Sequence, residues 1–188
     1  MSRRESRSGW LSVADYLRME ETAEVRHEYL GGEIHALAGA SKRHNRITLN
    51  IGRLLDEASR GGSCRVYVSV VKVRAAEEVF YYPDVVVACG EARSSPFVES
   101  EPCLLVEVTS PSTEVIDRRE KLLVYRRIAS LRAYLIVDQM SIRVDRYFHD
   151  GSGEWHHDVV EDAGVVTVPC PDTDLQLDAI YERADSEV

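Results

Sequence analysis

Two acidic residues, Asp84 and Glu107, stand in apolar strand-like segments where a carboxylate is costly to bury. Asp84 follows Pro83 and opens the run DVVVAC, and Glu107 lies inside the run CLLVEVT. A buried carboxylate needs a cation or a metal ion as its partner. Two carboxylates on neighbouring strands supply the hard oxygen ligands that Mg²⁺ prefers. The pair therefore predicts a Mg²⁺ site, in which we expect Mn²⁺ to substitute.

Each acid also has an ordinary structural interpretation. A Pro-Asp pair often marks a turn before a strand, and Glu107 can face solvent from an exposed side of a sheet. The two acids nevertheless occur in consecutive apolar strands that a basic helix follows. This combination favours a metal site over two unrelated structural residues.

The elements that must position these acids alternate in type, which predicts an α/β fold. The hydrophobic pattern predicts helices over 12–21, 41–60 and 113–128, and strands over 64–74, 80–89, 103–109 and 133–138. The strand–helix–strand unit at 103–138 predicts a parallel pair joined by a right-handed crossover. The earlier strands suit antiparallel pairing. We therefore expect a single domain with a mixed β-sheet flanked by helices.

The two ends of the chain add smaller elements. Gly31-Gly32 predicts the turn of a hairpin over 26–38, and segments between 142 and 168 predict a C-terminal strand meander. The helix over 41–60 has an expected apolar stripe made of Ile47, Leu49, Ile51, Leu54 and Leu55. We expect a disordered tail at 1–10, one domain at 11–182 and a short tail at 183–188.

Composition limits the class of protein. Hydrophobic residues make up 44% of the 188, which excludes a disordered chain. No apolar run reaches the roughly 18 residues that span a membrane, and the N-terminus MSRRESRSGW does not resemble a signal peptide. We therefore expect a cytoplasmic protein. The cysteines are expected to be buried reduced thiols rather than zinc ligands or disulfides, because none forms a CxxC pair: Cys64, Cys89, Cys103 and Cys170.

The net charge of -9 is unevenly distributed along the chain. Residues 149–188 contain 11 Asp and Glu against one Lys or Arg, whereas residues 1–148 contain 21 against 22. The acidity therefore belongs to the C-terminal end, and a bound metal ion would offset the site carboxylates. Charge alone neither supports nor excludes a nucleic-acid substrate.

Six ordered segments resemble a known family over about residues 11–182. They are RHEYLGGEI (26–34), ALAGASKRHNRI (36–47), YYPDVVV (81–87), LLVEVTSPSTE (104–114), DRREKLLVYRRI (117–128) and SLRAYLIVD (130–138). The set resembles the Uma-type (Uma-two) putative restriction endonuclease family of the PD-(D/E)XK nuclease superfamily. The resemblance implies a restriction-endonuclease-like fold and metal-dependent hydrolysis of phosphodiester bonds, with DNA as the expected substrate.

The resemblance also implies roles for individual residues. Asp84 and Glu107 match the two motif acids and would bind the metal. The superfamily places a lysine two residues after the second acid, where this chain has Thr109. The family resemblance instead implies Lys121, on the following helix, as the catalytic lysine. The alternative for Lys121 is a surface residue paired with Asp117, four residues earlier.

Three further residues are candidates for the site. Tyr125 lies one helical turn after Lys121 and shares its face. An early acid often completes the metal site in this superfamily, and Glu28 is preferred over Glu33 on the opposite arm of the hairpin. His44 could reach phosphate or water, although a capping or surface histidine is the favoured interpretation.

The implied substrate requires positive charge outside the acidic site. Basic residues on the two helices could contact phosphates, although most of them also suit solvated helix faces: Lys42, Arg43, Arg46, Arg118, Arg119, Arg126, Arg127 and Arg132. Cutting both strands of a duplex usually needs two sites, so a homodimer is expected. The alternatives are a catalytically silent nucleic-acid-binding or interaction module, and a metal hydrolase that acts on another substrate.

Overall fold

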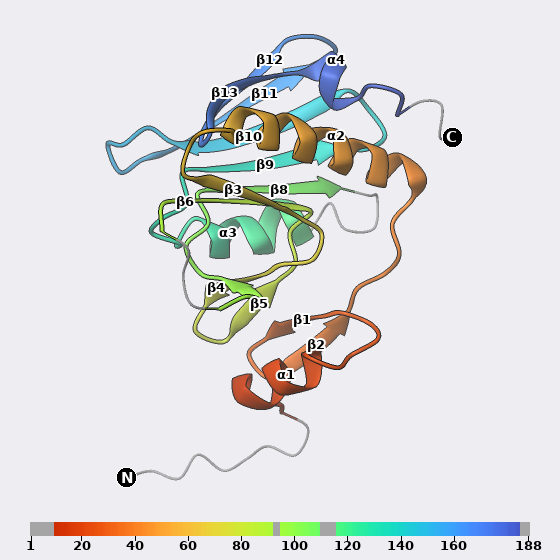
Figure 1. Cartoon of the computed structure of the whole chain (residues 1–188), viewed down its shortest axis with the longest axis vertical. Helices are drawn as coiled ribbons and strands as arrows, with labels where there is room; N and C mark the ends of the chain where they lie inside the picture. The colour runs from red at the N-terminus through yellow and green to blue at the C-terminus, as the bar shows by residue number, and fades with distance from the viewer. Residues whose placement is uncertain (1–9, 92–94, 110–115, 185–188) are drawn as a thin grey trace.

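A six-stranded mixed sheet forms the centre of the computed structural model, which describes residues 10–91, 95–109 and 116–184 (Figure 1). Its strands lie in the order β11-β10-β9-β8-β6-β3. Their bounds are Cys64–Val68 (β3), Val85–Cys89 (β6), Leu104–Thr109 (β8), Ala133–Asp138 (β9), Arg143–His149 (β10) and Trp155–Glu161 (β11). As predicted, β8 and β9 are parallel, and the other pairs in this sheet are antiparallel.

Helices cover both faces of this sheet, which confirms the predicted fold class. Helix α2 (Lys42–Ser59) packs on one face, and α3 (Leu122–Tyr125) follows the π-helical turn η1 (Ile116–Lys121) on the other. The pleat of β6 shows this division, because Val85 and Val87 join the core cluster under α2 while Val86 joins the cluster under α3.

A second sheet carries the N-terminal elements. It is five-stranded, in the order β2-β1-β5-β4-β7. The strands are β1 (His27–Leu30), β2 (Glu33–Ala36), β4 (Lys72–Ala76), β5 (Val79–Tyr81) and β7 (Val98–Glu99). Helix α1 (Val13–Glu20) attaches to it through an aromatic cluster in which Tyr16 stacks on Tyr29 and contacts Phe80.

The two sheets divide segments that the sequence pattern had joined, so two strand predictions were wrong. The segment 64–74 breaks at Ser69, which has a φ of 57°, and β3 and β4 therefore enter different sheets. The segment 80–89 breaks at Pro83, which has no N–H to donate to a ladder. The second break leaves Asp84 at the junction between the sheets.

Two helix predictions also need correction. The helix predicted over 113–128 is shorter in the structure. Residues 113–115 lie outside the described residues, and the helix ends at Tyr125, after which tight turns continue to Ile128. Leu49 does not belong to the apolar stripe of α2, since its side chain is 51% exposed. It lies two residues from both Ile47 and Ile51, which turns it to the opposite side of a helix with 3.6 residues per turn.

The C-terminal segment covers the α2 side of the core. Strands β10 and β11 extend the main sheet, as the predicted meander requires, while β12 (Val165–Pro169) and β13 (Asp172–Gln176) form a separate two-stranded sheet. Helix α4 (Leu177–Ile180) follows, and Ala184 is buried beside it. The sequence pattern did not predict β13 or α4. In the described part of the chain, no helix has the length and apolarity needed to cross a membrane.

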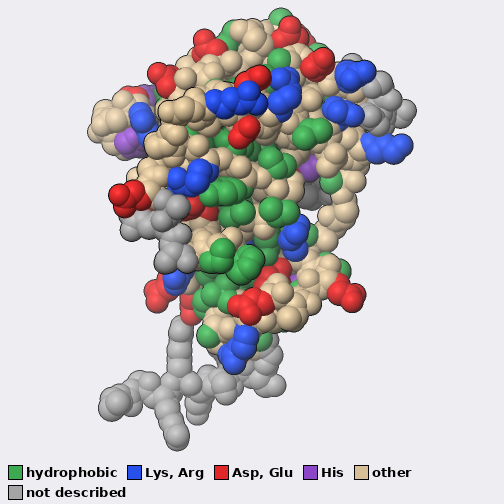
Figure 2. Space-filling view, viewed as in Figure 1, with side chains coloured by type: hydrophobic (Ala, Val, Ile, Leu, Met, Phe, Trp, Pro, Cys, Tyr) green, Lys and Arg blue, Asp and Glu red, His purple; other side chains and the backbone are tan. Residues whose placement is uncertain are grey.

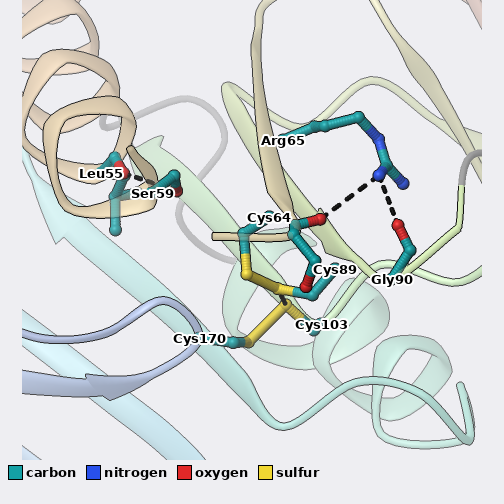
Figure 3. Close-up of a disulfide and its surroundings, with 9 residues drawn as sticks. Leu55, Ser59, Cys64, Arg65, Cys89, Gly90, Cys103 and Cys170 are labelled. Carbon is teal, nitrogen blue, oxygen red and sulfur yellow. Dashed lines mark hydrogen bonds between the residues drawn. A yellow bond between two sulfur atoms is a disulfide. The ribbon is translucent and has the colours of Figure 1, made fainter. Parts of the chain in front are cut away.

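The prediction of reduced thiols disagrees with the structure, which pairs Cys64 with Cys89 and Cys103 with Cys170 as disulfides (Figure 3). The antiparallel register of β3 and β6 places Cys64 directly opposite Cys89. Cys170 reaches Cys103 from the turn between β12 and β13. This convergence depends on tertiary folding, and no short sequence spacing reveals it.

The two faces of α2 give a matched test of the core. Ile51 is fully buried, so we expect Ile51→Ala to lower the free energy of unfolding by about 2–5 kcal/mol. The exposed Leu49 provides the control, and Leu49→Ala should change it by less than about 0.5 kcal/mol. Urea unfolding followed by circular dichroism measures both. Equal effects of the two substitutions would contradict this assignment of the helix faces.

Candidate metal and catalytic site

A pocket of about 680 Å³ opens where the two sheets meet. It lies beside the N-terminus of α2 and includes the residues on either side of the break before β6. Six of the polar or charged residues that line it come from separate parts of the chain: Glu28, His44, Asp84, Glu107, Lys121 and Gln139. The structure therefore brings together residues that are far apart in the sequence.

Asp84 is fixed against the neighbouring strand. The pairing of Val85 with Val106 places Asp84 beside the carboxyl-terminal half of β8. Its Oδ2 atom accepts a hydrogen bond of 2.8 Å from the backbone N–H of Val108 and lies 3.2 Å from Nε2 of His44. Both contacts use the same oxygen, which leaves Oδ1 of Asp84 for a cation.

Glu107 is a buried carboxylate, 5% exposed, on the α3 side of β8. The alternation of the strand turns Val106 and Val108 into the core under α2 and turns Glu107 the other way. Its Oε1 atom accepts hydrogen bonds of 3.0 Å from both Nζ of Lys121 and the hydroxyl of Tyr125. These partners offset the cost of burying the charge.

Lys121 joins two of the acids. Its Nζ atom lies 3.0 Å from Oε1 of Glu107 and 3.1 Å from Oε1 of Glu28, and the residue is only 7% exposed. Lys121 is therefore a buried residue of the pocket and not a surface lysine. Thr109, at the position of the superfamily lysine, is buried and donates to the Val137 carbonyl at 3.4 Å. The cation beside Glu107 comes from the helical segment.

The two hairpin acids differ in their position relative to the pocket. Glu28 on β1 lines the pocket, and its Oε1 atom also accepts a weak hydrogen bond of 3.4 Å from the backbone N–H of Tyr82. Glu33 on β2 is exposed and does not line the pocket. The hairpin thus contributes one carboxylate to the site, from the strand that pairs with β5.

His44 combines a backbone role with a site contact. Its N–H donates to the hydroxyl of Ser41, the residue that caps α2, at 3.0 Å. Its ring, however, is only 15% exposed and faces Asp84. The favoured interpretation of a capping or surface residue therefore missed the contact with the acid. That contact depends on how α2 docks against the sheet, which the sequence does not specify.

Tyr125 is fully buried beside the site. Burial raises the pKa of its phenol well above the usual value of 10, and the negative charge of Glu107 raises it further. The phenol therefore stays protonated at neutral pH and donates its hydrogen bond to Glu107. This arrangement fixes one oxygen of the carboxylate without adding a charge.

Removing this hydroxyl gives a defined prediction. We expect Tyr125→Phe to lower the free energy of unfolding by about 1.5–3 kcal/mol, the usual contribution of a hydrogen bond to a charged group. Chemical denaturation at pH 7 measures the change. An unchanged stability in Tyr125→Phe would show that the bond to Glu107 contributes nothing.

The donor set fits a hard divalent cation. Among the described residues, four acidic side chains line the pocket (Glu24, Glu28, Asp84 and Glu107), against two basic ones, Arg26 and Lys121. Counting these six formal charges, the excess is two negative charges, which one Mg²⁺ or Mn²⁺ would balance. Carboxylate oxygens are the ligands that these ions prefer. Asp84 and Glu107, on adjacent strands, are the residues that would hold the ion.

Sequence reasoning missed several residues of the pocket, among them Tyr82 and Gln139. Gln139 follows β9 directly, and its side-chain oxygen accepts a hydrogen bond of 2.8 Å from the hydroxyl of Ser41. Ligands of α/β proteins often bind beyond the carboxyl ends of parallel strands, and this position could have identified Gln139 as a candidate. The backbone N–H of Tyr82 donates to Glu28, a contact that side-chain motifs cannot reveal.

Known proteins are similar to this chain in sequence. Two uncharacterized proteins of Synechocystis sp. (strain ATCC 27184 / PCC 6803 / Kazusa), sll1609 and slr1290, are 38% and 37% identical over 149 and 148 residues. Each match covers 77% of this chain, and the matches cover 84% and 77% of the two proteins respectively.

A solved structure has the same fold. It is the crystal structure of a putative nuclease belonging to DUF820 from Anabaena variabilis ATCC 29413, with a TM-score of 0.75 and 14% sequence identity. The match covers 93% of this chain and 99% of that chain. Residues 13–179 also match the Uma2 family, whose description is "Putative restriction endonuclease". This chain therefore belongs to the Uma2 family.

Proposed function

We propose that this protein is a metal-dependent endonuclease that hydrolyses phosphodiester bonds, with DNA as its substrate. The observation that carries the proposal is the convergence of Asp84, Glu107, Glu28 and Lys121 in one pocket. Membership of a family described as putative restriction endonuclease supports the same chemistry. Bound at Asp84 and Glu107, Mg²⁺ or Mn²⁺ would act as a Lewis acid and lower the pKa of a water molecule.

The side chains of the pocket have different roles in the proposed reaction. Asp84 and Glu107 bind the cation, and the contacts from Val108 and Tyr125 keep both carboxylates in place. Lys121 has its ammonium group inside the pocket, where it can orient the attacking water or stabilise the negative charge that develops on the phosphate oxygens. Glu28 holds Lys121 from the opposite side.

The surroundings of the pocket suit a phosphate chain. The N-terminus of α2 lines it through Ser41, His44 and Asn45, and a helix N-terminus favours anions. Lys42 is exposed on the first turn of this helix. On the face shown in Figure 2, Lys and Arg side chains are interspersed with Asp and Glu. We therefore expect phosphate contacts near the N-terminus of α2.

The test must separate cleavage from binding and nucleic acid from other substrates. Purified protein is incubated with duplex DNA, single-stranded DNA, RNA and a small aryl phosphodiester, in Mg²⁺, Mn²⁺ or EDTA. We expect DNA cleavage in Mg²⁺ and Mn²⁺ and none in EDTA. Tight DNA binding without cleavage in either metal would favour the catalytically silent module. Turnover of the small ester alone would favour a hydrolase with another substrate.

The expected homodimer belongs to this proposal, because two copies of the pocket would allow both strands of a duplex to be cut. Sedimentation analysis of the free protein and of its complex with a short duplex measures the assembly. A dimer should form at least on the duplex. A monomer that nicks only one strand would contradict the dimer and leave the nuclease proposal intact.

A further inference from the structure

All four cysteines of the chain meet at the end of the main sheet opposite the carboxylate pocket (Figure 3). Cys64 begins β3, Cys89 ends β6, Cys103 immediately precedes β8, and Cys170 lies in the turn between β12 and β13. Asp84 precedes the strand that Cys89 ends, so the two places are about 16 Å apart along β6 at 3.3 Å per residue. The sulfur cluster is therefore separate from the proposed nuclease site.

Three of the four sulfur atoms form one group, and the fourth is bonded to a member of it. The sulfurs of Cys89, Cys103 and Cys170 all lie within 4.8 Å of one another, and those of Cys89 and Cys103 are 3.2 Å apart. Cys64 joins the group through its bond to Cys89. Tetrahedral zinc with Zn–S bonds of about 2.3 Å places its sulfur ligands about 3.8 Å apart, which is within this range.

We propose that the reduced protein binds one Zn²⁺ through Cys64, Cys89, Cys103 and Cys170. A phosphine reductant supplies two electrons to each disulfide and becomes a phosphine oxide, while water supplies the oxygen of that oxide and two protons, so the two disulfides yield four thiols. Zinc then binds four thiolates and releases four protons, which gives a complex with a net charge of -2. Four thiolates are the donor set of closed structural zinc sites, whereas the acidic pocket offers hard oxygen ligands.

The surroundings suit a partly buried anionic cluster. Cys103 and Cys170 are buried, whereas Cys64 and Cys89 are half-buried and leave a path for the ion. The guanidinium of Arg65 donates to the carbonyls of Ser63 and Gly90, the neighbours of Cys64 and Cys89 in the chain. This fixed positive charge lies beside the half-buried pair and would offset part of the charge of the complex.

The proposed ion would connect parts of the fold that no shared sheet connects. The β12–β13 sheet is separate from the main sheet, and Cys170 in its turn meets Cys89 at the end of β6 and Cys103 just before β8. Binding of zinc should therefore stabilise the folded state, because the unfolded chain does not hold the four sulfurs together. The expected role is structural.

Cobalt provides the direct test, since tetrahedral Co²⁺ thiolates absorb strongly in the visible and near ultraviolet. The full chain is reduced with a phosphine under nitrogen, freed of reductant and titrated with Co²⁺. We expect a thiolate charge-transfer band that saturates at one sulfur-bound Co²⁺ per chain, displacement of that ion by Zn²⁺ and a higher melting temperature with Zn²⁺. Cys103→Ser and Cys64→Ser should each weaken the band. Asp84→Asn is the matched control and should leave it unchanged.

Two outcomes would overturn the proposal. One is a reduced protein with four thiols by chemical titration that shows no cobalt thiolate band. The other is a pair of disulfides that resists reduction in the folded protein, which would mean that the four cysteines only cross-link the fold. If circular dichroism shows that Cys103→Ser does not fold, the half-buried Cys64→Ser variant tests the site instead. An unchanged cobalt band in Cys64→Ser would also contradict the four-ligand site.

Discussion

Asp84→Asn and Glu107→Gln are each expected to reduce metal-dependent DNA cleavage by more than about 100-fold. Both substitutions preserve the shape of the side chain but remove the charge that would hold the cation. Asp84 should tolerate the change structurally, because an amide oxygen can still accept the hydrogen bond from Val108. Initial rates of plasmid nicking in Mg²⁺ and in Mn²⁺ measure the loss.

The matched control for these variants is Glu33→Gln. Glu33 is also an acidic residue, but it lies on hairpin strand β2, where it is exposed and outside the pocket. We expect wild-type cleavage in this variant. Circular dichroism and urea unfolding must show that Asp84→Asn and Glu107→Gln remain folded. A cleavage rate of folded Asp84→Asn within about twofold of the wild-type rate would contradict the metal-binding role of Asp84.

Lys121→Met is expected to have the second large effect. Loss of the ammonium group should lower kcat by about 10²–10³-fold, the usual cost of removing one group that stabilises transition-state charge. It also leaves the buried Glu107 and the partly buried Glu28 without their shared cation, which should cost about 3–5 kcal/mol of stability. Arg119→Met, an exposed cation on the same helical segment, is the control.

The catalytic and structural effects of Lys121 can be separated with metal. If the pocket binds Mn²⁺, the ion should compensate the excess negative charge and restore much of the stability of Lys121→Met while leaving kcat low. Unfolding curves with and without Mn²⁺, together with single-turnover rates, provide the two measurements. Restored stability with full activity would make Lys121 only a charge partner. A variant as stable as wild type without metal would contradict the buried ion pair.

The strand containing Glu107 shows what local pattern can predict. CLLVEVT identified a buried strand with one acid on a defined side, and AYLIVD identified its parallel neighbour, because apolar side chains and the pleat determine these features. The breaks at Ser69 and Pro83 were missed because strand-like residues continue on both sides of each break. Only tertiary folding assigns the two halves to different sheets.

Lys121 shows where a resemblance adds to the pattern. Residue spacing alone could not decide between a surface lysine and a lysine turned towards Glu107, since both fit the same helix. The family resemblance proposed the second, and the structure places Nζ 3.0 Å from Glu107. Neither source suggested the contact of His44 with Asp84 or the meeting of four cysteines, because these depend on how distant elements pack.

The cysteine cluster affects how metal removal must be interpreted. EDTA would remove a cation from the carboxylate pocket and could also extract zinc from the four sulfurs. Loss of cleavage in EDTA therefore does not by itself locate the catalytic metal. A variant of the carboxylate site with an intact sulfur cluster is needed, and Asp84→Asn meets this requirement because the two places lie at opposite ends of β6.

The most direct test of the central claim is nicking of supercoiled plasmid in Mn²⁺ by wild type and Asp84→Asn, side by side and at equal folded concentration. The proposed site predicts that wild type converts the plasmid to open circles in Mn²⁺ and not in EDTA, while Asp84→Asn leaves it supercoiled in both. Equal nicking by both proteins, or none by wild type across DNA and RNA substrates, would contradict a nuclease built on Asp84 and Glu107.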